Sequence, residues 1–125
     1  MIAIDSSSLI AYLGGGTGRD VDVVDLALRQ GQAVLPPVVL SELLSEPKLT
    51  PSVIALLLEI PLLGVGDGYW ARTGTLRASL LRRRRKARLA DCLIAQSCLD
   101  HQVPLLTRDR DFRSIAAAAG LTLVA

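Results

Sequence analysis

Short apolar runs alternate along the whole chain with longer stretches of helical periodicity. Such runs are typical of buried strands, and apolar residues that recur every three or four positions indicate helices. Strands are expected at 2–4, 33–35, 62–65, 103–107 and 121–124. Helices are expected at 6–13, 21–30, 37–45, 51–60, 69–84, 89–102 and 110–119. This alternation favours parallel strands joined by helical crossovers.

Prolines and glycines support several of these boundaries. Pro37 and Pro51 suit the first turn of a helix, and Gly120 is a typical helix stop. We therefore predict an α/β fold, a three-layer α/β/α arrangement around a central parallel sheet of about four or five strands. Because 125 residues suffice for one core but not for two, residues 1–125 should form a single domain.

Composition excludes several classes of protein. Only 3% of the residues are aromatic although 50% are hydrophobic, so the core must be built from aliphatic side chains. No apolar run reaches the roughly 18 residues of a membrane span, and no basic segment precedes Asp5 as in a secretory signal. Cys92 and Cys98 are too far apart for a C-x-x-C motif. We expect a cytoplasmic protein with buried free thiols and no membrane partner.

Four carboxylates stand at the ends or inside of apolar elements. Asp5 and Asp109 each follow a predicted strand, so both should lie at the carboxyl edge of the sheet, where α/β proteins bind ligands. Glu42 lies within a predicted helix and Asp91 near the start of another, each beside apolar residues. Clustered carboxylates repel and are costly to desolvate, and a cation offsets both effects. A site whose ligands are all carboxylate oxygens is expected to bind Mg²⁺ or Mn²⁺.

Each of these acids also has an ordinary explanation. Asp5 and Asp91 can each cap the helix that follows. Glu42 can pair with a distant arginine, and Asp109 and Asp111 can be turn residues. The order strand, helix, helix, strand in which the four acids occur favours a metal site over four coincidences.

Four segments resemble the motifs of PIN-domain nucleases. Residues 2–10 (IAIDSSSLI) look like the opening hydrophobic-Asp-Ser/Thr motif, and residues 38–43 (VVLSEL) are similar to the second motif, which carries a glutamate. Residues 89–95 (LADCLIA) resemble the third motif and residues 105–112 (LLTRDRDF) the fourth. The ordered set spans nearly the whole chain, whose length fits the small VapC-type toxin ribonucleases of toxin–antitoxin pairs.

The resemblance implies Mg²⁺- or Mn²⁺-dependent hydrolysis of RNA phosphodiester bonds. The acids it assigns to catalysis and metal binding are Asp5, Glu42, Asp91 and Asp109. Ser6 and Thr107 fall where the family often has a supporting hydroxyl. Asp111 is a possible fifth acid, which can share the role of Asp109 or replace it. The chain's one histidine, His101, excludes a mechanism that needs two.

Positive charge is concentrated in the second half of the chain. Residues 1–67 carry 8 acids and 3 bases, whereas residues 68–125 carry 4 acids and 11 bases. The run 82–88 (RRRRKAR) is either a solvated helix end or a surface that draws RNA to the acids. Consecutive bases on a helix point in all directions, so only some can face one ligand. The candidate RNA contacts are Arg82, Arg84, Arg85 and Arg88.

The expected partners are RNA as substrate and a cognate antitoxin. The apolar segments 43–44 and 53–58 offer more aliphatic surface than a small sheet can cover, which suits an antitoxin or a second copy in a homodimer. Two alternatives stay open at this point: a housekeeping RNA-processing nuclease with the same site, and a catalytically silent PIN module that binds RNA or protein.

Overall fold

The centre of the protein is a small parallel sheet. The computed structural model describes residues 1–124. Its strands are β1 (Ile2–Ile4), β2 (Ala33–Val34) and β3 (Leu105–Leu106), arranged in the order β2-β1-β3. Because β1 is central, it pairs with β2 along one side and with β3 along the other. The first strand of the chain is therefore held by segments from both halves of the sequence.

The predicted number of four or five strands is wrong, since residues 1–124 form three. The segments expected as strands at 62–65 and 121–124 are each reduced to one parallel bridge, Leu35 with Leu62 and Leu105 with Leu123. On the β2 side, Pro36 follows Leu35 and Pro61 precedes Leu62. Proline has no N–H to extend a ladder, so pairing stops after one bridge. The two segments therefore lie next to the edge strands, Leu62 beside the end of β2 and Leu123 beside β3.

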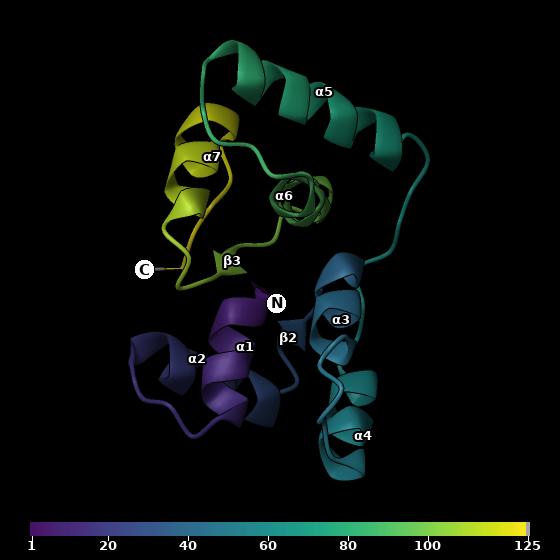
Figure 1. Ribbon diagram of the computed structural model, residues 1–125, viewed down its shortest axis with the longest axis vertical. Coiled ribbons are helices and arrows are strands. Elements are labelled where there is room, and N and C mark those ends of the chain that lie inside the picture. Colours follow the sequence, from purple (N-terminus) through teal and green to yellow (C-terminus); the bar gives the residue numbers. More distant parts are fainter. Residues whose placement is uncertain (125) are drawn as a thin grey trace.

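All seven predicted helices are present among residues 1–124, and the first has the predicted bounds. They are α1 (Ser6–Leu13), α2 (Arg19–Arg29), α3 (Pro37–Leu44), α4 (Pro51–Glu59), α5 (Tyr69–Arg82), α6 (Leu89–His101) and α7 (Asp111–Ala119). Figure 1 shows α1 and α2 on one side of the strands and α6, with α5 outside it, on the other. The three-layer α/β/α prediction is confirmed. No helix within residues 1–124 has the length and apolarity needed to cross a membrane.

The end of α5 differs from the sequence prediction. The helix stops at Arg82 instead of continuing to residue 84, and Arg84 adopts a left-handed backbone with φ 56°. Arg83 Nη1 donates to the Ala118 carbonyl at 3.4 Å, and Arg85 Nη1 donates to Ser114 Oγ at 3.0 Å. These contacts hold the basic run against α7 as a connection between two helices. The expectation that its bases wrap around a helix is therefore wrong.

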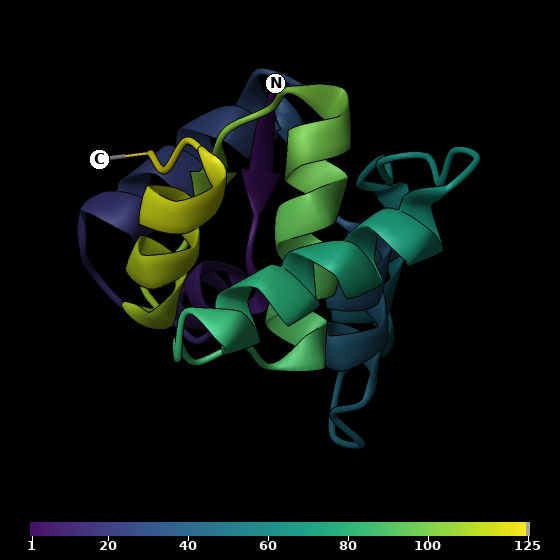
Figure 2. The ribbon, with the colours of Figure 1, turned by 90° about the horizontal axis from the view of Figure 1, so that it is seen from above.

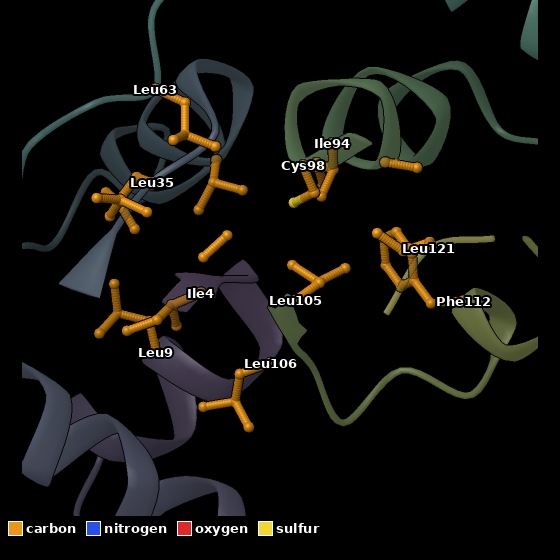
Figure 3. Close-up of a cluster of buried hydrophobic side chains, with 14 of the residues drawn as sticks. Ile4, Leu9, Leu35, Leu63, Ile94, Cys98, Leu105, Leu106, Phe112 and Leu121 are labelled. Atoms are coloured by element: carbon orange, nitrogen blue, oxygen red, sulfur yellow. The ribbon is translucent and has the colours of Figure 1, made fainter. Parts of the chain in front are cut away.

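Aliphatic side chains from both faces of the sheet fill the core. Ile4 and Leu105 come from the strands, and Leu9, Ile94 and Phe112 come from the helices that cover them (Figure 3). All five are at most 1% exposed, so this core fixes the positions of the strand ends.

Both cysteines are free and buried, as predicted. Burial raises the pKa of the Cys98 thiol to about 12, which leaves it protonated at neutral pH. The cysteines therefore belong to the core and not to a reactive or soft-metal site.

The carboxyl ends of the strands meet several helix ends. In Figure 2 the arrow of β1 points to the side where α6 and α7 begin and where the α5–α6 connection lies. The acids predicted at strand ends and helix starts are therefore brought to one edge of the molecule.

Candidate metal centre

Asp5 follows the central strand and is almost fully buried, with 3% of its surface exposed. Its backbone N–H donates to the Leu106 carbonyl at 2.9 Å, which ties the end of β1 to the end of β3. Its Oδ2 accepts hydrogen bonds from Ser7 Oγ at 2.8 Å and from Thr107 Oγ1 at 2.7 Å. Although Asp5 occupies the N-cap position of α1, its side chain makes no capping bond. The capping interpretation of Asp5 is therefore wrong.

Ser7 and Thr107 form a hydroxyl bridge between the first and the last motif. Their oxygens lie 3.2 Å apart, and each also accepts a backbone N–H, Ser7 Oγ from Arg108 and Thr107 Oγ1 from Asp109. Of the two expected hydroxyls, Thr107 thus contacts Asp5, whereas Ser6 contacts Glu42. The contact of Ser7 with Asp5 was not predicted. The signal that could have identified Ser7 is its place two positions after Asp5, within reach of that carboxylate.

Glu42 lies on α3 with an exposed side chain, not against a buried face as expected. Its contact is with Ser6, whose Oγ lies 3.4 Å from Glu42 Oε1, and no arginine or lysine of residues 1–124 pairs with it. Partial burial of the carboxylate, followed by the charge of Asp5, raises the pKa of Glu42, and Asp91 raises it further. These charge effects place Glu42 at the rim of the same acidic edge.

Asp91 lies in the first turn of α6, which begins at Leu89 with Arg88 as its N-cap residue. The interpretation of Asp91 as the cap of a helix starting at residue 92 is therefore wrong. Burial is the main cause that raises the pKa of Asp91, and the charges of Asp109 and Asp5 raise it further. Arg88 acts in the opposite direction. Asp91 is thus a partly desolvated carboxylate among like charges.

Asp91, Asp109 and Asp111 form a close cluster. Each offers one carboxylate oxygen, and these oxygens lie within 4.8 Å of one another. The Asp111 N–H donates to Asp109 Oδ1 at 2.9 Å, so the turn before α7 aims both side chains at Asp91. Lys86 Nζ lies 2.9 Å from Asp111 Oδ2 and lowers the pKa of Asp111. One member of the cluster therefore forms an ion pair, and the other two form none among residues 1–124.

The donor chemistry of this edge fits a hard divalent cation. Three aspartates within 4.8 Å provide oxygen ligands alone, the set that Mg²⁺ and Mn²⁺ prefer. Asp5 and Glu42 lie outside that cluster but are coupled to it through their charges. The one imidazole, His101, is at the opposite end of α6, where its Nε2 lies 2.7 Å from the Gly64 carbonyl oxygen.

Arg108, between Thr107 and Asp109, ties this edge to α2. Its Nε and Nη2 donate to the two carboxylate oxygens of Asp20 at 2.8 and 2.9 Å, and Nη2 also reaches the Thr17 carbonyl at 3.3 Å. The guanidinium holds the pKa of Asp20 at about 2. This bidentate pair closes the glycine-rich connection between α1 and α2 over the fourth motif. No local pattern indicates this pair, because the two residues lie far apart in the chain.

A groove runs beside the acidic edge between α1, α3 and α4. It has a volume of about 530 Å³ and is lined by Ile10, Glu42, Leu43, Val53 and Leu57 among others. Glu42 therefore belongs both to the acidic edge and to this mostly apolar groove. Ile10 is 59% exposed, which leaves apolar surface open beside it.

Comparison with known proteins agrees with this architecture. The PIN domain family profile matches residues 2–118. The fold is similar to VapBC2 from Rickettsia felis bound to a DNA fragment from their promoter, with a TM-score of 0.75 and 17% identity over 99% of this chain and 98% of that one. It is also similar to VapBC-5 from Mycobacterium tuberculosis, with a TM-score of 0.66 and 23% identity over 98% and 95%.

A third similar structure is FitAcB from Neisseria gonorrhoeae, with a TM-score of 0.67 and 19% identity over 100% of this chain and 97% of that one. No curated protein sequence matches the chain significantly.

Proposed function

The chain belongs to the PIN-domain family, and on that premise we propose that it is a metal-dependent endoribonuclease, the toxin of a type II toxin–antitoxin pair. The observation that carries the proposal is the convergence of Asp91, Asp109 and Asp111 beside the buried Asp5. These acids come from separate elements and are held in mutual repulsion. A fold has no structural need for such an arrangement, whereas a cation site does.

Asp5, Glu42, Asp91 and Asp109 are the proposed catalytic and metal-binding residues. A bound Mg²⁺ or Mn²⁺ would lower the pKa of a water molecule and offset charge on the phosphate oxygens. The hydroxyls of Ser7 and Thr107 fix one oxygen of Asp5. No hydrogen bond within residues 1–124 reaches the other oxygen, Oδ1, so it can serve as a ligand.

Glu42 is the residue best placed to accept a proton. It lies at the exposed rim of the acidic edge, and its pKa is raised towards neutral pH compared with that of an ordinary glutamate. Arg88, at the start of α6, provides positive charge beside the acids for an RNA phosphate. RNA would thus be held by arginines while the carboxylates act on the scissile bond.

The proposed protein partner is an antitoxin that occupies the groove between α1, α3 and α4. VapBC-5 is named as a member of the VapBC family of toxin–antitoxin systems, and its fold resembles this chain over nearly its full length. The groove offers apolar surface with Glu42 and Glu46 in its lining, which suits an apolar helix carrying a basic residue. We also propose a homodimer, because exposed apolar residues such as Trp70 and Leu62 lie outside this groove.

A silent binding module is the weaker reading of the same fold. A module that only binds would gain nothing from a partly desolvated Asp91 next to Asp109, since that repulsion lowers its stability. A housekeeping nuclease would share the acids but would not need an inhibitor encoded beside it. The gene neighbourhood separates these two nucleases, because a small reading frame just upstream favours the toxin.

Substitution of the two deeper acids tests the proposal. Asp5→Asn and Asp91→Asn should each reduce Mn²⁺-stimulated cleavage of RNA by roughly 10³-fold or more, while the fold is retained. Without metal, each variant should melt no lower than the parent, because a repelling charge is lost. Mn²⁺ should raise the melting temperature of the parent and of the control Asp67→Asn, and of the two site variants much less. Variants that melt lower and still cut RNA would refute the metal site.

A further inference from the structure

A second hollow adjoins the acidic edge on the side of β3 and α7. It has a volume of about 320 Å³, and its lining includes Asp109, Arg110, Arg113, Leu123 and Val124. We name it the arginine pocket. Asp109 belongs both to this pocket and to the acid cluster, so the two sites are continuous.

Arg110 and Arg113 make the pocket basic. Arg110 is the N-cap residue of α7 and Arg113 follows three positions later, a spacing that puts both side chains on the same face. Both are exposed, and within residues 1–124 neither guanidinium has a hydrogen-bonded or ion-paired partner. Arg108, which also lines the pocket, differs because Asp20 holds it on both carboxylate oxygens. Two guanidinium forks are therefore available to an anion.

The lining also has an apolar part. Leu123 and Val124 are only partly covered and form one wall of the pocket. Phosphate requires the guanidinium groups alone, whereas a ribose or base also requires apolar surface. The pairing of unengaged arginines with aliphatic wall fits a nucleotide better than a free phosphate. A volume of about 320 Å³ is at the small end of ligand pockets, which suits one nucleotide unit.

We propose that the arginine pocket binds the nucleotide of RNA next to the phosphodiester at the acidic cluster, an inference that rests on the proposed ribonuclease function. The phosphate of that nucleotide contacts Arg110 and Arg113, and its sugar or base contacts Leu123 and Val124. The pocket is lined by residues that follow β3 and by residues of α7 and the C-terminal segment, whereas the groove is lined by residues of α1, α3 and α4. Figure 1 shows α7 on the β3 side of the sheet and α3 and α4 on the β2 side. The arginine pocket and the groove therefore share no lining residue, although both adjoin the acidic edge.

Binding without cleavage tests the pocket. In the Asp5→Asn background with EDTA, a fluorescein-labelled 12-nucleotide single-stranded RNA is titrated and followed by anisotropy at several salt concentrations. Arg110→Gln and Arg113→Gln should each weaken binding by about threefold to tenfold. Each should also reduce the slope of log affinity against log salt, and the double variant should reduce it by roughly 0.7, the value for one phosphate contact on a single strand. Arg113→Lys should lose less RNA affinity than Arg113→Gln, because lysine keeps the positive charge but cannot make the bidentate contact of a guanidinium.

Arg29→Gln is the matched control, since it removes one exposed arginine at the far end of α2. Pocket variants that bind RNA like this control would overturn the proposal. So would variants that lose affinity only for the antitoxin, because the pocket would then be a protein contact. If the parent with intact Asp5 binds RNA through the pocket but never cleaves it, the ribonuclease function fails and the binding site stands.

Discussion

Lys86 Nζ lies 2.9 Å from Asp111 Oδ2, so a lysine of the basic run neutralises one member of the acid cluster. Asp109 is different. After burial, the charge of Asp109 is the largest effect that raises the pKa of Asp91, whereas the charge of Asp111 contributes least. The geometry thus separates two residues that the sequence left interchangeable. Asp109 is the proposed metal ligand, and Asp111 is engaged by Lys86.

Lys86→Gln should therefore tighten Mn²⁺ binding by about three- to tenfold, because a positive charge next to the cation is lost. Isothermal titration of Mn²⁺ measures the effect. Lys48→Gln is the matched control, since the chain has only these two lysines and Lys48 is at the other groove. Asp109→Asn should weaken binding by roughly tenfold or more, and Asp111→Asn by less than about threefold. The reverse order for the two aspartates would assign the ligand role to Asp111.

Removing selected bases of the run should separate RNA binding from stability. The triple variant Arg82→Ala, Arg84→Ala, Arg88→Ala should weaken RNA binding and reduce its salt slope by up to roughly 2, with little change of the cleavage rate at saturating RNA. Arg83→Ala removes the same kind of charge but loses a contact with α7, so it should lower the melting temperature and keep the slope. An unchanged slope in the triple variant would make the run an ordinary solvated connection.

A charge placed in the groove should prevent the antitoxin from binding. Val53 lines the groove on α4, whereas Leu58 on the same helix is 60% exposed and outside it. Val53→Asp should abolish the complex with the upstream gene product in co-purification, and Leu58→Asp should retain it. Both variants should keep the circular dichroism spectrum of the parent. Loss of the complex only in Leu58→Asp would move the contact to the outer face of α4.

The Arg108–Asp20 pair should make stability depend on acidic pH. The pKa of Asp20 falls from 3.8 to about 2, so folding favours its ionised form. The stabilisation is present above pH 3.8 and is lost as the pH falls towards about 2. Asp20→Asn should thus melt a few degrees below the parent at pH 5, and the difference should shrink between pH 4 and pH 2.5. A difference that does not change with pH would show that charge plays no part.

The sequence predicted those features that depend on local pattern. Asp5 and Asp109 were placed correctly because each follows an apolar strand, and parallel strands end at a common edge. The edge segments near Leu62 and Leu123 had the pattern of strands, but each makes only one bridge in the sheet. How far neighbouring segments run alongside each other is a tertiary property, which apolar patterning does not encode.

The supporting contacts of the site could not be predicted in the same way. Ser7 with Thr107 and Arg108 with Asp20 join residues that lie far apart in the chain. Lys86 stands within a run of arginines, and no local pattern distinguishes its role from theirs. Its role depends on the left-handed backbone of Arg84, which breaks the helix and redirects the residues that follow. Such a turn at a non-glycine residue has no sequence signature.

The central position of β1 also determines when the site can exist during synthesis. β1 meets β2 as soon as about the first third of the chain is available, but its other side stays open until β3 has been made. Non-local pairing of this kind is completed late. Asp109 follows β3, so a ribosome-bound chain still short of it has an incomplete set of acids. The proposed metal site therefore cannot be complete until β3 and Asp109 have been synthesised and β3 has paired with β1.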